Sequence, residues 1–210
     1  MSKKQTITFH KEYDCAIFPQ RGTEASAGFD FFVPKPTSVN SNAFTQLKAK
    51  INNFSEDIFG PNDTPELMFL RLLFLWNKQE GRINRSYLYV HPDKPTIWLY
   101  PGENLLIPSG ISADIPKGYV LDARNKSGVA SKKSLIAGAE LVDEDYTGIM
   151  HIDMHNIGTK EQEITCGMKI VQFMLEESHI YEVEQVNSEE PISKITERGA
   201  GGFGSTGTQA

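Results

Sequence analysis

Most of the chain consists of short apolar or alternating runs with Gly, Pro, Asn and Asp between them. The runs are rich in β-branched and aromatic residues, which is typical of strands joined by tight turns. His151 to His155 alternates polar and apolar residues, the period of a half-buried strand. The pattern predicts an all-β protein, a jelly roll or β-barrel. The predicted strands are Thr6–Phe9, Gly28–Val33, Asn104–Ile107, Tyr119–Ala123, Gly148–His155, Gln162–Ile164 and Met168–Glu176.

The segment from about 37 to 98 departs from this pattern and is predicted to be an insertion in a single domain of 210 residues. After a polar, Asn- and Ser-rich stretch, Asp63 to Glu66 has the composition of a helix start, with a capping side chain, a Pro in the first turn and an acid at the positive end of the dipole. We expect a helix over about 64–79. Its apolar residues surround the axis, so it should be buried against the barrel or a neighbouring subunit. A docking surface for another protein is the alternative.

Composition excludes several classes of protein. The hydrophobic and charged fractions, 39% and 23%, are those of a globular domain. A net charge of −6 argues against general binding to nucleic acid. The apolar runs are too short to cross a membrane, and the N-terminus has no signal-peptide core. Cys15 and Cys166 fit neither a metal site nor a disulfide framework, which favours the cytoplasm.

The last fourteen residues, 197–210, form a glycine-rich tail with a G-x-G-x-x-G pattern. Only six residues follow Gly204, so no helix can begin there and a dinucleotide-binding turn is excluded. The free backbone N–H groups and the Arg198 guanidinium suit phosphate, and the Phe203 ring can stack on a base. We expect a mobile lid that closes on a ligand, with a disordered terminus as the alternative.

Three further segments carry candidate chemistry. In the acidic hairpin from Gly138 to Gly148, Asp143 follows two apolar residues and is a candidate general base at the lip of a pocket. The basic loop from Arg124 to Ala130 suits phosphate oxygens, and Gln172 lies in an apolar strand where its amide needs partners. His151, Asp153 and His155 share a strand face, but their spacing of roughly 7 Å makes convergence on one metal ion difficult.

Five segments resemble, in order and spacing, the five motifs of the homotrimeric dUTPases. The resemblance covers about 9–34 and 99–208 and leaves the insertion outside. The matching segments are Ala27-Gly28-Phe29-Asp30, Lys126-Ser127-Gly128, Gly138-Ala139 with Val142-Asp143-Glu144-Asp145-Tyr146-Thr147-Gly148, Gly167-Met168-Lys169-Ile170-Val171-Gln172, and Arg198-Gly199-Ala200-Gly201-Gly202-Phe203-Gly204-Ser205-Thr206-Gly207.

The resemblance implies a jelly-roll subunit, a homotrimer with shared active sites, and hydrolysis of dUTP to dUMP and pyrophosphate with Mg²⁺. Asp143 would activate the attacking water, and Tyr146 would pack on the deoxyribose. The triphosphate would supply the inner metal ligands, with Asp30 acting through metal-bound water. The other substrate-binding residues that the resemblance implies are Lys126, Ser127, Gly128, Gly138, Leu141, Val142, Gln172, Arg198, Phe203, Gly204, Ser205 and Thr206.

Two departures and two alternatives accompany the resemblance. Lys126 stands where the family usually has Arg, which removes a bidentate phosphate contact unless Arg124 takes part. Ile149 replaces a residue that is often polar. dCTP deaminase looks like dUTPase in fold, and Asp153 matches the position of its catalytic glutamate, one carbon shorter. The other alternative is a dUTPase-like regulatory protein that acts through its insertion.

Overall fold

The computed structural model describes residues 5–179, 181–185 and 196. The chain divides into a compact unit, Met1–Ser178, and a second unit from His179 to Ala210. Each predicted site residue of the tail, from Arg198 to Thr206, lies outside the described residues.

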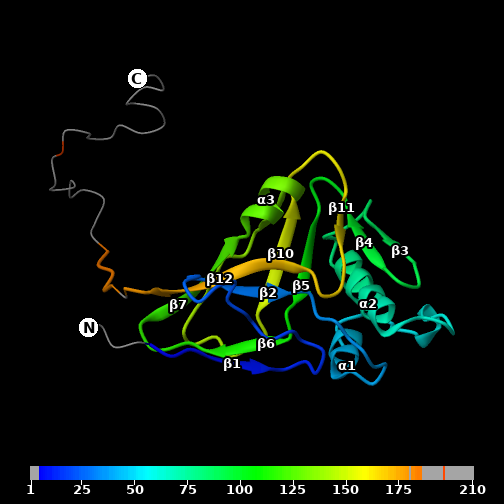
Figure 1. The fold of residues 1–210 in the computed structure, drawn as a ribbon, viewed down its shortest axis with the longest axis horizontal. Helices are drawn as coiled ribbons and strands as arrows, with labels where there is room; N and C mark the ends of the chain where they lie inside the picture. The colour runs from blue at the N-terminus through cyan, green and yellow to red at the C-terminus, as the bar shows by residue number, and fades with distance from the viewer. Residues whose placement is uncertain (1–4, 180, 186–195, 197–210) are drawn as a thin grey trace. The chain divides into compact units, whose positions relative to one another are not determined.

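The compact unit is built mainly of short strands (Figure 1). The helices are α1 (Asn42–Lys48), α2 (Pro65–Gln79) and α3 (Ser127–Lys133), with a 3₁₀ turn at Glu56–Ile58. The strands are β1 (Thr8–Lys11), β2 (Phe29–Phe32), β3 (Tyr87–Tyr89), β4 (Thr96–Leu99), β5 (Asn104–Pro108), β6 (Ile111–Asp114), β7 (Tyr119–Asn125), β8 (Leu135–Ala137), β9 (Leu141–Val142), β10 (His151–Asn156), β11 (Gln162–Ile164) and β12 (Lys169–Glu177).

All the strand pairs described are antiparallel, and they form four small sheets. The orders are β2-β12-β7-β9, β5-β10-β8, β11-β4-β3 and β1-β6. β12 lies between β2, from the first part of the chain, and β7, from its middle, and pairs with both. The all-β class predicted from the sequence is confirmed.

The insertion contributes to the hydrophobic core. Figure 1 shows α2 beside β3 and β4, with α1 below α2, at the side of the compact unit away from β7. The Thr64 side chain caps α2, and seven of its residues are buried, including Phe69 and Trp76. In α1, the 3.6-residue period brings Ala43, Phe44 and Leu47 to one buried face. These side chains belong to the same cluster as the strand residues, so the segment predicted to be an insertion shares one core with the strands.

Two buried polar side chains attach the insertion to the strands. Asn77 of α2 is fully buried and pairs with both backbone groups of Leu106 on β5: its Nδ2 donates to the carbonyl at 3.0 Å, and its Oδ1 accepts from the N–H at 2.8 Å. Glu103, before β5, accepts from the backbone N–H of Arg85 at 2.7 Å and of Ser86 at 3.0 Å. Burial acts to raise the pKa of Glu103, but the hydrogen bond from the Ser86 hydroxyl and those from the backbone N–H groups outweigh it and lower the pKa.

The structure contains two helices that the sequence did not predict, and strands β3, β4 and β8, which were not among the predicted strands. α1 lies in the stretch read only as polar, and α3 replaces the predicted loop after β7. α3 has no buried residue, so no apolar period could reveal it. The helix begins with local bonds in which the N–H groups of Val129 and Ala130 donate to the Lys126 carbonyl.

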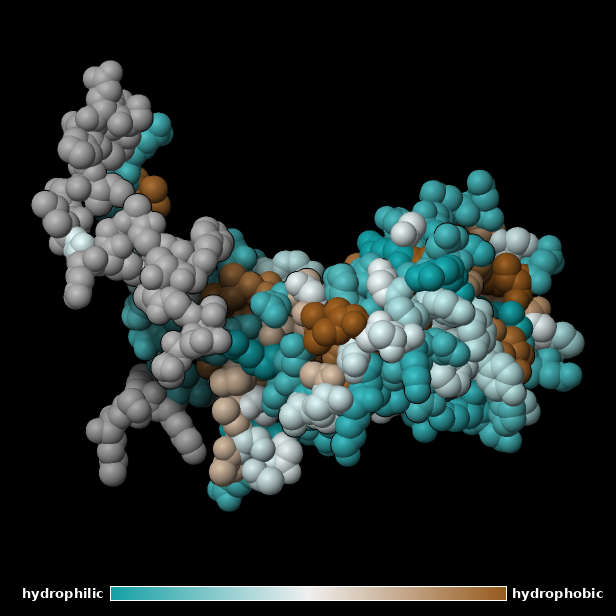
Figure 2. Space-filling model, turned by 90° about the horizontal axis from the view of Figure 1, so that it is seen from above, coloured by the Kyte–Doolittle hydropathy of each residue, from teal (hydrophilic) through white to brown (hydrophobic). Residues whose placement is uncertain are grey.

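The surface in Figure 2 is mostly hydrophilic, with apolar side chains in small separate groups. Among the described residues, the exposed large apolar side chains include Tyr87, Tyr89 and Val90 of the insertion and Leu141 and Tyr146 of the hairpin. None of the helices in the described part of the chain is long and apolar enough to span a bilayer.

Candidate active site

The acidic hairpin encloses a small cavity of about 170 Å³. Asp143 and Tyr146 lie at its mouth, together with half-buried Val142. The lining residues are Ala139, Leu141, Val142, Asp143, Tyr146, Met150, His151 and Phe173. Asp143 has no side-chain hydrogen bond or ion pair within the part of the chain that the structure describes, so its carboxylate is available to a ligand or to water.

Local backbone chemistry fixes Tyr146. The N–H of Tyr146 donates to the Asp143 carbonyl at 3.2 Å, which closes the turn. The Tyr146 hydroxyl donates to the Ile149 carbonyl at 2.9 Å, and the ring lies against Gly148. A Cβ atom on Gly148 would lie 2.6 Å from the Tyr146 hydroxyl oxygen. Only glycine therefore allows this position of the phenol ring.

A second group of predicted residues surrounds Asp30, which is nearly buried on β2. One carboxylate oxygen of Asp30 accepts from Lys126 Nζ, and the other lies 2.9 Å from Lys169 Nζ. Burial acts to raise the pKa of Asp30, but the two ammonium groups outweigh it and lower the pKa. Two cations around one carboxylate leave a net positive charge, which suits a phosphate.

Gln172, Ser127 and Gly128 belong to the same end of the sheet. Gln172 on β12 lies opposite Asp30 on one side and Arg124 on the other. Its amide nitrogen donates to the Asn125 carbonyl at 3.2 Å. Ser127 and Gly128 form the first turn of α3, where backbone N–H groups lack helical acceptors.

The two groups of predicted residues lie at opposite ends of β7. Val142 pairs with Leu121, so Asp143 is beside the start of β7, whereas Lys126 follows its last residue. Six strand positions of about 3.3 Å each separate these levels, or roughly 20 Å. A single chain therefore does not bring Asp143 to the lysines.

The polar side chains of β10 are engaged with one another. Asp153 accepts from Asn104 Nδ2 at 2.7 Å, and its other oxygen lies 2.9 Å from His155 Nε2. A Cβ on Gly138 would lie 2.3 Å from that same nitrogen, so the start of the hairpin packs directly on this pair. Both carboxylate oxygens of Asp153 therefore already have side-chain partners. Among the described residues, no group of three His, Cys, Asp or Glu side chains could hold a metal ion.

Two cations change the sequence-based picture. Arg124 Nη2 pairs with Asp122 at 2.6 Å and with Glu176 at 3.0 Å, so it already has two acidic partners. The sequence reasoning gave no role to Lys169, although it belongs to a matching segment. In the sequence, the only sign that Lys169 has a charged partner is its position at the start of an apolar strand.

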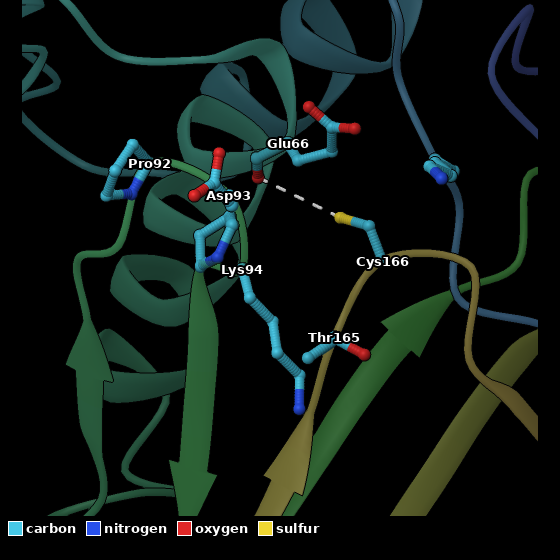
Figure 3. A pocket seen from close by; sticks show the side chains of 8 residues that line it. Glu66, Pro92, Asp93, Lys94, Thr165 and Cys166 are labelled. Atoms are coloured by element: carbon cyan, nitrogen blue, oxygen red, sulfur yellow. Dashed lines mark hydrogen bonds between the residues drawn. The ribbon is translucent and has the colours of Figure 1, made fainter.

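A different polar cavity, of about 180 Å³, lies between the insertion and the turn after β11. Figure 3 shows Glu66 and Lys94 on one side and Thr165 and Cys166 on the other, with the Cys166 thiol directed at the Glu66 carbonyl. Lys94 Nζ is paired with Glu163 at 2.6 Å. None of the predicted site residues that the structure describes lines this cavity.

The dUTPase family model matches residues 94–207, more than half of the chain. The chain belongs to the dUTPase family. Among curated relatives, the deoxyuridine 5'-triphosphate nucleotidohydrolase of Chlamydia trachomatis is 38% identical over 113 residues, which are 53% of this chain and 76% of that protein. The enzyme of the same name from Roseobacter denitrificans is 38% identical over 120 residues, covering 55% of this chain and 74% of its own.

Solved dUTPase structures share the fold. The dUTPase of Staphylococcus bacteriophage 80alpha, solved with dUpNHpp, superposes with a TM-score of 0.62 at 20% identity, covering 98% of this chain and 100% of that one. The dUTPase of phage phi11 of S. aureus, described as having a species-specific insert, gives 0.55 at 18% identity, with coverages of 90% and 100%. The dUTPase-like jelly roll expected from the sequence is confirmed.

Proposed function

We infer that the protein hydrolyses dUTP to dUMP and pyrophosphate, which keeps uracil out of DNA and supplies dUMP for thymidylate synthesis. Family membership supports this activity. The structural observation that supports it is the Asp143 carboxylate, which has no partner among the described residues and lines, with Tyr146, a cavity of about 170 Å³.

Asp143 is the proposed general base. Its free carboxylate can accept a hydrogen bond from water, orient it and take its proton as the oxygen attacks the α-phosphorus. The bond from that phosphorus to the bridging oxygen breaks, and pyrophosphate leaves with the electron pair. The reaction needs one oriented carboxylate and a set of fixed donors for the phosphates.

The cavity and Tyr146 are proposed to select the nucleoside. The backbone from Gly138 to Val142 would read the edge of uracil, and the narrow space would exclude the methyl group of thymine. The fixed Tyr146 ring would pack on deoxyribose and leave no room for a 2′-hydroxyl. Leu141 and Tyr146 are 61% and 42% exposed, which supports their being covered by substrate or by another subunit.

The proposed phosphate contacts are Lys126, Ser127, Gly128 and Gln172, and Lys169 can add a second ammonium. Both oxygens of Asp30 accept from lysines, so we expect the triphosphate to supply the inner ligands of Mg²⁺. A carboxylate oxygen can accept a further hydrogen bond, which fits contact through metal-bound water. The ion would neutralise charge on the leaving group. Arg198, Phe203, Gly204, Ser205 and Thr206 are proposed to close over the substrate.

A homotrimer with shared sites is the proposed assembly. The roughly 20 Å between Asp143 and Lys126 supports it, because one subunit would provide the base and nucleoside pocket and another the phosphate contacts. We also expect the cytoplasm as the compartment, since Cys15 and Cys166 are free thiols.

The test is a pyrophosphate-release assay on the purified protein with Mg²⁺ and, separately, dUTP, dTTP, dCTP and UTP. We expect release from dUTP alone. Ammonia from dCTP would favour the deaminase alternative, and no product from any nucleotide would contradict the proposed function.

A further inference from the structure

His151 lies at the boundary between the nucleoside pocket and the insertion. His151 lines the cavity together with Asp143 and Tyr146. On another side it meets Trp76 of α2 edge to face, with ring centroids 6.2 Å apart and an interplanar angle of 62°. One half-buried side chain therefore contacts both the pocket and the insertion helix.

Trp76 is held firmly in its place. Trp76 is 94% buried, and the Lys50 ammonium and Arg82 guanidinium lie 4.8 and 5.2 Å from a centroid of its ring system. The next residue, Asn77, pairs with both backbone groups of Leu106 on β5. Since β5 is hydrogen-bonded to β10, this anchor ties the helix to the strand that carries His151.

The charge state of His151 suits a structural contact. Burial lowers the pKa of the imidazole, and nearby Lys50 and Arg82 lower it further, while an interaction with the Ile149 backbone acts in the opposite direction. A neutral ring packs on Trp76 without a desolvated charge and does not compete with a ligand for the Asp143 carboxylate.

His151 is also close in the chain to the acceptor that fixes Tyr146. The Tyr146 hydroxyl donates to the carbonyl of Ile149, two residues before His151. Met150, between them, is buried, and its N–H donates to the Ile111 carbonyl at 2.8 Å. Displacing the imidazole would act on this short, tightly packed backbone segment.

We propose that His151 is a positioning residue of the nucleoside pocket and that Trp76 of the insertion holds it there. The inference rests on the proposed function, since it assigns a role within the dUTP site. The insertion then contributes to that site. The contact between His151 and Trp76 should determine the affinity for the nucleoside, and it should have little effect on water activation by Asp143.

The test compares Trp76→Leu with a matched control, Phe74→Leu, on the opposite side of α2, where Phe74 lines a separate groove with Tyr87 and Lys78. An edge-to-face pair contributes a factor of roughly three to ten in an equilibrium. We expect Trp76→Leu to raise KM for dUTP, and Kd for dUMP, by that factor, with kcat changed less than about twofold. Phe74→Leu should leave both constants unchanged, and Trp76→Phe should restore most of the affinity.

A double-mutant cycle completes the test. His151→Ala alone should raise KM by about the same factor, and adding Trp76→Leu should raise it little further. If Trp76→Leu does not fold, KM for dUTP is compared among His151→Ala, Trp76→Phe and the parent protein instead. Equal KM values in Trp76→Leu, Phe74→Leu and the active parent would overturn the inference while the proposed function stands. A parent protein that does not hydrolyse dUTP would overturn both.

Discussion

At the scale of single residues, Asp143 is the most informative position, because it is at the pocket and has no partner in the described part of the chain. We expect Asp143→Asn to lower kcat by at least a hundredfold, since the amide cannot take a proton from water. The Kd of a non-hydrolysable dUTP analogue should change by less than about threefold, because the amide keeps the shape of the side chain. Single-turnover kinetics and calorimetry provide the two measurements. Turnover near that of the parent protein would exclude Asp143 as the base.

Gly148 is the second informative residue, because its missing side chain makes room for the Tyr146 phenol. In Gly148→Ala the new Cβ would lie 2.6 Å from the hydroxyl oxygen, so the ring must move and lose its hydrogen bond to Ile149. We expect a KM for dUTP raised about tenfold and weaker discrimination against UTP, measured by parallel kinetics.

Gly148→Ala needs a glycine-to-alanine control elsewhere in the chain. Gly81→Ala does not serve, because Gly81 has a positive φ of 72°, which alanine adopts only with strain. Gly60→Ala is better matched: its φ is ordinary, and the nearest atom to the added Cβ would be Asp63 Oδ1 at 3.1 Å. If Gly148→Ala discriminates between dUTP and UTP as the parent protein does, Tyr146 does not contact the sugar.

At the scale of elements, the junction between the insertion and the strands depends on the ionised form of Glu103. We expect Glu103→Gln to lower the free energy of unfolding by about 2 kcal/mol at pH 7, because the amide NH₂ faces backbone donors. The pKa of Glu103 is lowered in the folded protein, so its contribution is present above the unfolded value and is lost as the pH falls through the folded value.

The difference in free energy of unfolding between Glu103→Gln and the parent protein should therefore become smaller below about pH 4. Urea unfolding at pH 7 and at low pH measures it, and a difference independent of pH would show that the charge of Glu103 is irrelevant. Exposed Glu56→Gln is the control.

Elements whose start signals and apolar residues stand out in the sequence could be predicted. α1 could not, because its short apolar face lies within an Asn- and Ser-rich stretch, and neither could α3. The helix now seen as α2 has a Pro in its first turn and a capping Thr64, both of which are visible in the sequence. α3 buries nothing and begins with backbone bonds to Lys126, for which no composition signal exists. The nucleoside-pocket residues follow from the hairpin and the family motifs, whereas Lys169 and His151 acquire their contacts only through tertiary packing.

At the scale of the whole molecule, mixed trimers can test whether the two groups of site residues come from different subunits. Asp143→Asn and Lys126→Ala should each be nearly inactive. If different subunits supply these residues, a mixture refolded together forms intact sites at some interfaces. Random assembly at equal amounts would restore about a quarter of the parent activity.

The restored activity should appear only after co-refolding, and mixing the separately folded proteins is the control. Sites confined to one subunit would give no recovery in either experiment.

The pairing of Asp30 on β2 with Gln172 on β12 has a consequence for synthesis on the ribosome. More than a hundred residues must be made after β2 before its partner strand exists, which at roughly 5–20 residues per second takes on the order of ten seconds. During that time the aromatic side chains of β2 lack their β12 neighbour, and Phe9 of β1, whose ring packs on Phe29 and Phe31, is an aromatic contact already available to them. Ribosome-bound chains that stop before Lys169 should therefore be cut by protease faster than chains that include β12.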